Sequence, residues 1–350
     1  MIIKDIKCML EEGVKASHFP GASFGICYMD GSMSQDYIGY KSLFPKKEDL
    51  KGNEIYDVAS LTKVVSTTTL IMKLIEQKKL SLETKVNQIL DWFQFDEITI
   101  YDLLTHSSGL PADLIRASTL KNRNDVISRI KNVELKYMKG EHIVYSDIGF
   151  ILLGLIIEKI TGKSLNENGQ ELIFKPLDMK DTSYHPDVSR CAPTEVRDDD
   201  VYQGLLCGKV HDEKAFALGE SGHAGLFSTV FDLLKFMNAI LNHQFVLKDE
   251  TLDLLFKVQQ IKPDLNGHIL KRALGWDKPT AGSSSGDNRC FDDTILHTGF
   301  TGCNMFIDKN QGIGFVMLSN AVHPKRNNNG IIAYRNIIGN MLVDKREEIK

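Results

Sequence analysis

The chain lacks the features that mark membrane proteins and nucleic-acid binders. Its 350 residues contain no run of about 18 uncharged apolar residues, which a membrane-spanning helix would need. Charges also break its first seven residues before an apolar signal segment could form. Basic and acidic residues nearly balance, at 42 and 46, with no long basic run. We therefore expect a cytoplasmic protein with no nucleic-acid or membrane partner.

Cysteine is scarce, and its spacing is uninformative for metal binding. The six cysteines form no C-x-x-C pair, which favours reduced thiols over a disulfide framework or a zinc site. No two of the ten histidines show the i, i+4 spacing of a metalloprotease helix. We expect no metal and no cofactor. The alternative, a metal hydrolase built on His211, Asp212 and His223, would be sensitive to EDTA.

The stretch from Asp57 to Lys63 is the one around which the chain is organised. The residues that follow it place apolar side chains at spacings of three and four, the periodicity of a helix packed into a core. These positions are Leu61, Val64, Val65, Thr68, Ile71, Met72 and Ile75. The pattern predicts a buried helix that opens at Ser60.

Ser60 and Lys63 are three residues apart, so on a helix they share one face. Burial and neighbouring cations can lower the pKa of a lysine enough for it to act as a base, and a helix N-terminus supplies N–H groups for an oxyanion. Residues 118–121 and 128–131 fit the same S-x-x-K pattern, but they lie in polar segments typical of a solvated helix face. Our central hypothesis is that Ser60 is a catalytic nucleophile.

A second serine motif lies near the N-terminus. Residues 21–25 fit G-x-S-x-G, the nucleophile elbow of α/β-hydrolases, which needs a strand before it and a helix after it. Here a predicted helix, residues 3–16, comes first. Residues 22–29 and 33–40 flank Asp30-Gly31, a hairpin signal. We therefore interpret Ser23 as a strand residue.

Polar residues also precede a second apolar helix. Tyr145-Ser146-Asp147 stands immediately before residues 148–160, which Thr161-Gly162 closes. A lysine can stabilise the phenolate of a neighbouring tyrosine, which could then take the serine proton or protonate the leaving group.

A third group, His297-Thr298-Gly299, precedes a predicted hairpin of residues 303–307 and 312–319. Gly299 would let a substrate backbone lie against the strand edge, and the N–H of Phe300 could join that of Ser60 in an oxyanion hole. His223 lies in a glycine-rich segment whose backbone can approach a ligand closely, so we add it to the substrate-binding candidates. His106, in a turn-rich loop, is interpreted as holding that loop by hydrogen bonds.

Three motifs in this order resemble the active site of the penicillin-recognising serine hydrolases, and the chain looks most like the class C β-lactamase-like family with its esterases and D-peptidases. The resemblance covers nearly the whole chain. It implies that Ser60 is acylated, that Lys63 and Tyr145 share the base and acid roles, and that residues 297–299 line the substrate edge.

The resemblance also implies an α/β (α+β) fold. An antiparallel sheet built from both chain ends is flanked by helices, with a helical region inserted between. We expect a single catalytic domain over residues 1–350, with the sheet region in 1–58 and 215–350 and a mainly helical region in 59–214.

Two residues depart from the family pattern. The second motif usually ends in asparagine, whose amide can donate to a substrate carbonyl, whereas an ionised Asp147 only accepts. The third motif often starts with lysine in β-lactamases, where this chain has His297. His297 is the variant seen in some D-peptidases and related hydrolases. Asp147 favours a small ester as substrate, because an alkoxide leaves more easily than an amine and demands less of the second motif.

The leading prediction is therefore a carboxylesterase-like serine hydrolase acting on a small ester, or on an amide or peptide. A D-peptidase or β-lactamase is the second reading. A non-catalytic binding or sensor protein on the same fold is an alternative of another class, and multiple turnover of an ester would separate it from an enzyme.

Overall fold

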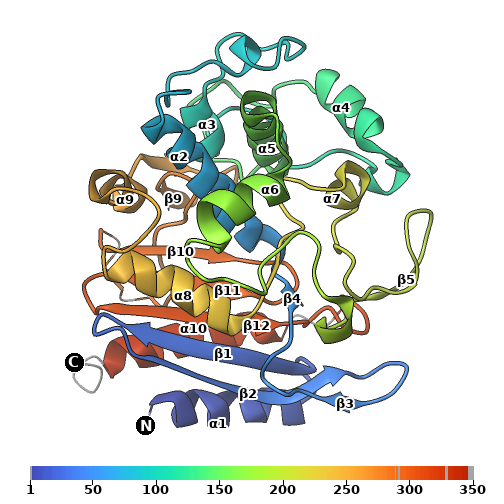
Figure 1. Ribbon diagram of the computed structural model, residues 1–350, viewed down its shortest axis with the longest axis vertical. Helices are drawn as coiled ribbons and strands as arrows, with labels where there is room; N and C mark the ends of the chain where they lie inside the picture. The colour runs from blue at the N-terminus through green and yellow to red at the C-terminus, as the bar shows by residue number, and fades with distance from the viewer. Residues whose placement is uncertain (1, 288, 291, 328–329, 346–350) are drawn as a thin grey trace.

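The computed structural model describes residues 2–287, 289–290, 292–327 and 330–345. Figure 1 shows a sheet with its flanking helices in the lower part of the molecule and a helical region above it. The predicted fold class, an antiparallel sheet from both chain ends with a helical insert, is confirmed.

The main sheet has six strands in the order β10-β11-β12-β1-β2-β3, and each strand is antiparallel to its neighbours. Strand β1 pairs with β12, with Ala22 opposite Ser319, so the two ends of the chain meet in the middle of the sheet. The strands are β1 (Gly21–Tyr28), β2 (Met33–Ser42), β3 (Glu48–Asp49), β10 (Thr294–Thr298), β11 (Asn304–Asp308) and β12 (Ile313–Ser319).

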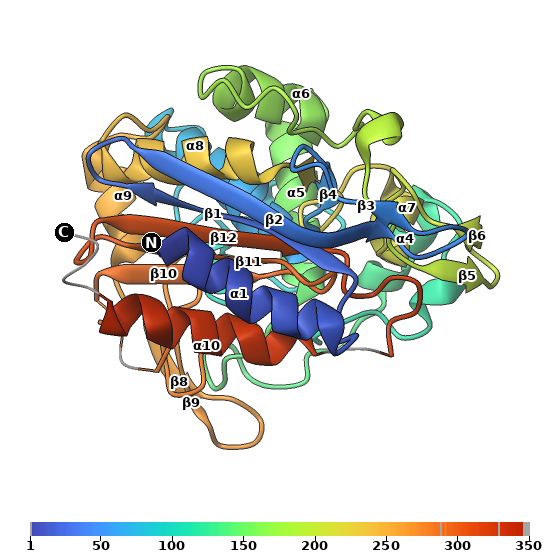
Figure 2. The ribbon, with the colours of Figure 1, turned by 90° about the horizontal axis from the view of Figure 1, so that it is seen from below.

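Helices cover both faces of this sheet. Helices α1 (Ile2–Lys15) and α10 (Ile331–Asp344) lie side by side on one face, as Figure 2 shows. Helix α8 (Val230–Leu241) packs against β1 and β12 on the other face. A Cβ atom on Gly25 would lie 2.8 Å from the Leu234 side chain, so the absence of a side chain allows α8 to approach the sheet closely.

The helical region contains most of the remaining helices. They are α2 (Thr69–Glu76), α3 (Ile100–Leu104), α4 (Arg123–Lys131), α5 (Asp147–Thr161), α6 (Leu165–Gly169) and α7 (Glu213–Leu218), and α9 (Asp249–Phe256) lies nearer the sheet. Helix α5 is almost entirely buried, and it is capped by the Ser146 side chain at its start and by Gly162, with φ of +67°, at its end. Asp147 is therefore held at the first turn of a rigid helix.

The described part of the chain also contains three two-stranded ladders. Strand β4 (Tyr56–Asp57) pairs with β7 (Phe227–Ser228), and this ladder ties the segment before Ser60 to the segment after His223. The other pairs are β5 (Val196–Asp198) with β6 (Gln203–Leu205) and β8 (Gln260–Pro263) with β9 (Ile269–Arg272).

The predicted hairpins and long helices are confirmed, and Ser23 lies inside β1, where its hydroxyl is 2.9 Å from that of Tyr56. All six cysteines are free thiols. Among the described residues, the helices are all too short or too polar to cross a bilayer.

Candidate active site

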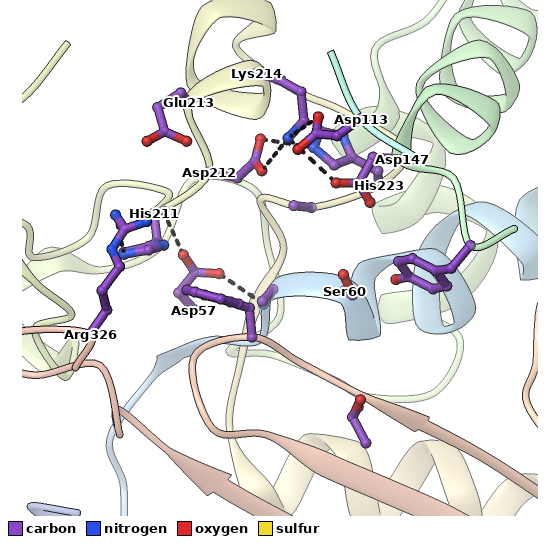
Figure 3. A pocket seen from close by; sticks show the side chains of 15 residues that line it. Asp57, Ser60, Asp113, Asp147, His211, Asp212, Glu213, Lys214, His223 and Arg326 are labelled. Carbon is purple, nitrogen blue, oxygen red and sulfur yellow. Dashed lines mark hydrogen bonds and ion pairs between the residues drawn. The ribbon is translucent and has the colours of Figure 1, made fainter. Parts of the chain in front are cut away.

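The three sequence motifs meet at one pocket of about 410 Å³. Figure 3 shows this pocket from close by. The pocket is lined by residues from the turn that carries Ser60, the end of β10, the start of α5, the segment around α7 and nearby loops. They are Asp57, Ala59, Ser60, Asp113, Tyr145, Asp147, His211, Asp212, Glu213, Lys214, His223, Ala224, Thr298, Phe300 and Arg326.

Ser60 lies in a single 3₁₀ turn, Ala59–Leu61, between β4 and a π-helical turn, Lys63–Thr68, that continues into α2. Ala59 has φ of +47°, a left-handed conformation that is strained for a residue with a side chain. The Asp57 carboxylate holds this conformation by accepting the Ala59 N–H at 2.9 Å. The predicted buried helix is present, but Ser60 is presented on a tight turn before it.

Lys63 is completely buried, and its amine has three acceptors. Its Nζ lies 2.9 Å from Ser60 Oγ, 2.9 Å from the His223 carbonyl oxygen and 2.8 Å from Asp147 Oδ1. Burial lowers the pKa of Lys63, but the Asp147 carboxylate and Tyr145 outweigh it and raise that pKa above its ordinary value. Lys63 is therefore an ammonium in the resting site.

Tyr145 lies beside this pair. The Lys63 Nζ is 4.9 Å from the centre of its ring, and the Arg272 guanidinium is 5.5 Å from the same centre. Burial raises the pKa of the Tyr145 phenol, although Lys63 opposes this shift. The resting site thus holds a protonated lysine and a protonated phenol next to the Ser60 hydroxyl.

Asp147 contacts the lysine directly. Its Oδ1 binds Lys63 and its Oδ2 lies 3.4 Å from the Nζ of Lys214. Burial raises the pKa of the Asp147 carboxyl, but Lys63, His223 and Lys214 outweigh this and lower it. Asp147 is therefore a carboxylate bound between two ammonium groups.

His223 contributes its backbone and its side chain in different ways. Its carbonyl accepts from Lys63, while its buried imidazole links Ser221 Oγ, 2.7 Å from Nδ1, to Asp212 Oδ1, 2.8 Å from Nε2. This is a serine–histidine–aspartate chain, but Ser221 is buried and is not among the residues that line the pocket. The arrangement therefore orients His223 and Asp212.

The third motif ends strand β10. His297 is buried, its Nδ1 is 2.9 Å from the Thr298 carbonyl oxygen, and burial together with Lys63 and Arg272 lowers its pKa to about 3, so the imidazole is neutral. Thr298 lines the pocket. A Cβ on Gly299 would lie 2.6 Å from the Val58 carbonyl oxygen, so this glycine lets β10 pack against the segment that carries Ser60.

Phe300 follows on an exposed turn beside the pocket. Its side chain is 62% exposed, and its ring stacks on His211 with 5.5 Å between the ring centres. Its N–H donates to no other residue in the described part of the chain. This N–H therefore remains a candidate oxyanion donor together with that of Ser60.

His106, the loop histidine, has the structural role predicted for it. Its Nδ1 accepts the Ser146 N–H at 3.0 Å, and its carbonyl accepts the Val144 N–H at 2.9 Å. Burial lowers the pKa of this imidazole well below its ordinary value, so it stays neutral. His106 thus fixes the loop that carries Tyr145 to the start of α5.

Several pocket residues were not recognised as functional from the sequence, among them Asp57, Lys214 and Arg326. Asp57 fixes the turn at Ala59, and its second oxygen accepts the His211 N–H at 2.8 Å. Lys214 contacts Asp147, and Arg326 is held by Glu195 at 2.7 Å. Asp57 could have been found from its position three residues before Ser60, whereas Lys214 and Arg326 carry no signal in the sequence.

Among the residues that the structure describes, Asp147, Asp212 and His223 are those whose atoms could together hold a cation, since their ligand atoms lie within 4.8 Å of one another. Both carboxylates, however, are bound by lysine ammonium groups. The His211 imidazole, part of the alternative metal set, instead lies 2.9 Å from Glu195. The donor set thus fits ammonium groups.

Comparisons with known proteins agree with this geometry. A family model described as β-lactamase matches residues 6–337. An N-acetylmuramyl-L-alanine amidase of Bacillus subtilis (strain 168) is 30% identical, over 92% of this chain and 81% of its own length. A putative D-alanyl-D-alanine carboxypeptidase of Escherichia coli (strain K12) is also 30% identical, over 79% of this chain and 72% of its own.

Solved structures share the fold. EstCE1, described as a hydrolase with promiscuous acyltransferase activity, superposes with a TM-score of 0.78 at 19% identity, covering 97% of this chain and 98% of its own. At this level of sequence identity the similarity shows a shared fold only.

Proposed function

Because this chain belongs to the β-lactamase family of serine hydrolases, we propose that it cleaves a small amide, such as an acylated amino acid or a short peptide, through an acyl-enzyme at Ser60. The observation that carries the proposal is the 2.9 Å contact between Lys63 Nζ and Ser60 Oγ, beside Tyr145 in a pocket. A cytoplasmic location stays a prediction.

The chemistry proceeds in two halves. The Ser60 oxygen bonds to the substrate carbonyl carbon while its proton passes to the Lys63–Tyr145 pair, after that pair has lost one proton to solvent. The N–H groups of Ser60 and Phe300 receive the oxyanion. The pair then returns the proton to the departing amine as the C–N bond breaks. Water attacks the acyl-enzyme by the same route, which frees the acid and restores Ser60.

The names of two relatives favour an amide over the ester expected from the sequence. The relatives at 30% identity are described as an amidase and a putative carboxypeptidase, and both names denote cleavage of an amide bond.

Ester hydrolysis is the second candidate function. Asp147 is ionised and accepts from both lysines, so it offers no donor of its own to a substrate carbonyl. A D-peptidase or β-lactamase activity would use the same acyl-enzyme, and an inert acyl-enzyme would indicate a binding or sensor protein.

A matched pair of substrates tests these alternatives together with the role of Asp147. N-acetylalanyl-alanine and the corresponding lactate ester differ in one group, because the amide N–H of the first is an ester oxygen in the second. The D and L forms of each substrate would be compared by kcat/KM. We expect multiple turnover of the amide by the wild type. Asp147→Asn is nearly isosteric and adds a donor, so the amide-to-ester ratio of kcat/KM should rise about fivefold, as for one hydrogen bond of roughly 1 kcal/mol.

The ratio cancels any effect of the substitution on the activation of Ser60, since both substrates need it. Turnover of the ester alone would favour the second candidate, and acylation without turnover would favour the sensor. An unchanged ratio, or one that moves toward the ester, would show that Asp147 does not govern the choice between ester and amide.

A further inference from the structure

Lys214 is a buried lysine surrounded by carboxylates. Its Nζ lies 2.9 Å from Asp113 Oδ1, 2.9 Å from Asp212 Oδ2 and 3.4 Å from Asp147 Oδ2. These three residues come from the loop after Pro111, the N-cap of α7 and the first turn of α5. Figure 3 shows them converging on the lysine at one side of the pocket.

The geometry connects this cluster to the nucleophile through one group. Oδ1 of Asp147 contacts Lys63 and Oδ2 contacts Lys214, so the same carboxylate neutralises both ammonium groups. Lys63 in turn contacts Ser60. A change of charge at Lys214 must therefore change the electrostatic stabilisation of the Lys63 ammonium, which contacts the nucleophile.

We propose that Lys214 is a positioning residue that binds one oxygen of the Asp147 carboxylate. It thereby weakens the attraction between Asp147 and Lys63 and sets the pH at which Ser60 becomes reactive. The proposal rests on the acyl-enzyme function of Ser60. Lys214 acts through Asp147 and needs no contact with the reacting atoms.

The sign of the effect follows from the charges. Lys63 and Tyr145 must lose a proton before Ser60 can be activated, and a nearby positive charge makes that loss easier. Without Lys214, the Asp147 carboxylate would face Lys63 with no second ammonium group beside it, and it would hold the Lys63 proton more strongly. Burial lowers the pKa of Lys214, but Asp212, Asp147 and Asp113 outweigh it and raise that pKa, so Lys214 stays charged over the working pH range.

Lys214 contacts the second oxygen of Asp147 directly, and the His223 imidazole also lowers the pKa of that carboxyl. Lys63 faces Ser60, Asp147, Tyr145 and the neutral His223 carbonyl. The groups around Tyr145 are the neutral imidazoles of His106 and His297 and the Arg272 guanidinium, which is paired with Asp277. The His223 imidazole is held by Ser221 and Asp212, so it joins the cluster through the same Asp212 that binds Lys214.

The test measures how fast a fluorophosphonate labels Ser60 as a function of pH, by intact-protein mass, and so requires no knowledge of the substrate. In the wild type the rate constant should rise with pH. Lys214→Met should move the midpoint of that rise upward by about one pH unit. Asp113→Asn removes a negative charge at a half-exposed position, so it should move the midpoint downward by a smaller amount.

Opposite shifts from two neighbouring substitutions cannot come from general damage to the fold. Lys214→Arg, which keeps the charge, should restore the wild-type midpoint even if its maximum rate is lower. Coincident midpoints in the wild type, Lys214→Met and Asp113→Asn, or shifts of the same sign, would overturn the proposal. If the wild type is labelled no faster than Ser60→Ala at any pH, the proposed function itself fails, and this inference fails with it.

Discussion

Replacing Lys63 with alanine is expected to lower kcat by about three orders of magnitude, within the range found for removing a positioned acid–base group. KM should change little, because proton transfer belongs to the transition state and Lys63 is completely buried beneath Ser60. The measurement is steady-state kinetics on the alanyl-alanine substrate. The variant also leaves Asp147 bound only to Lys214, so its thermal stability would be recorded alongside.

Lys73→Ala provides the matched control for that variant. Lys73 lies on α2, which continues from the turn that carries Lys63, but it binds Glu76 at 3.2 Å and does not line the pocket. It should keep wild-type kcat. A folded Lys63→Ala variant with near-wild-type kcat would show that the lysine does not take part in proton transfer.

Replacing Tyr145 with phenylalanine is expected to lower kcat by about two to three orders of magnitude, again with little change in KM. The ring stays in place between Lys63 and Arg272, and only the hydroxyl is lost. Because burial raises the pKa of this phenol, the wild-type rate should rise on the alkaline side of neutrality. The loss in the variant should be largest where that rise is complete, which a pH profile of kcat would measure.

Tyr184→Phe tests whether the loss of any buried tyrosine hydroxyl has this effect. Tyr184 bonds to Ser66, 3.1 Å away, and lies outside the pocket lining. Its variant should keep both kcat and the pH profile. Equal losses in the two variants would mean that Tyr145 acts through packing alone.

Local patterns predicted much of the fold and of the site. The three-residue spacing of Ser60 and Lys63 does bring the two side chains into contact. The apolar run after Asp147 forms α5, whose caps at Ser146 and Gly162 stand where the sequence indicates them. These features depend on residues close together in the chain, so helical periodicity and capping chemistry are enough to find them.

The charge cluster could not be predicted in this way. Asp113, Asp147 and Lys214 are far apart in the sequence, and only Asp147 belongs to a recognisable motif. They meet only because α5, α7 and the loop after Pro111 pack around one pocket. The sequence alone therefore does not explain how an ionised Asp147 can lie beside a lysine base. In the structure the Asp147 carboxylate contacts two lysines, Lys63 and Lys214.

The presentation of Ser60 was also only partly predictable. Helical periodicity places Ser60 at the start of a regular helix, whereas the structure has a strained Ala59, a single 3₁₀ turn and then a π-helical turn. The strain depends on the hydrogen bond from the Ala59 N–H to Asp57. Such a conformation is stabilised by tertiary contacts, which spacing patterns do not contain.

The most direct test of the account is to find which serine becomes covalently modified. The protein would be treated with a fluorophosphonate or a β-lactam, digested, and its peptides mapped by mass spectrometry. The adduct is expected on Ser60, because Lys63 Nζ lies 2.9 Å from its oxygen and the side chain lines the pocket. An adduct on Ser221, which is bonded to His223, or on Ser23 within β1, with Ser60 unmodified, would contradict the central claim.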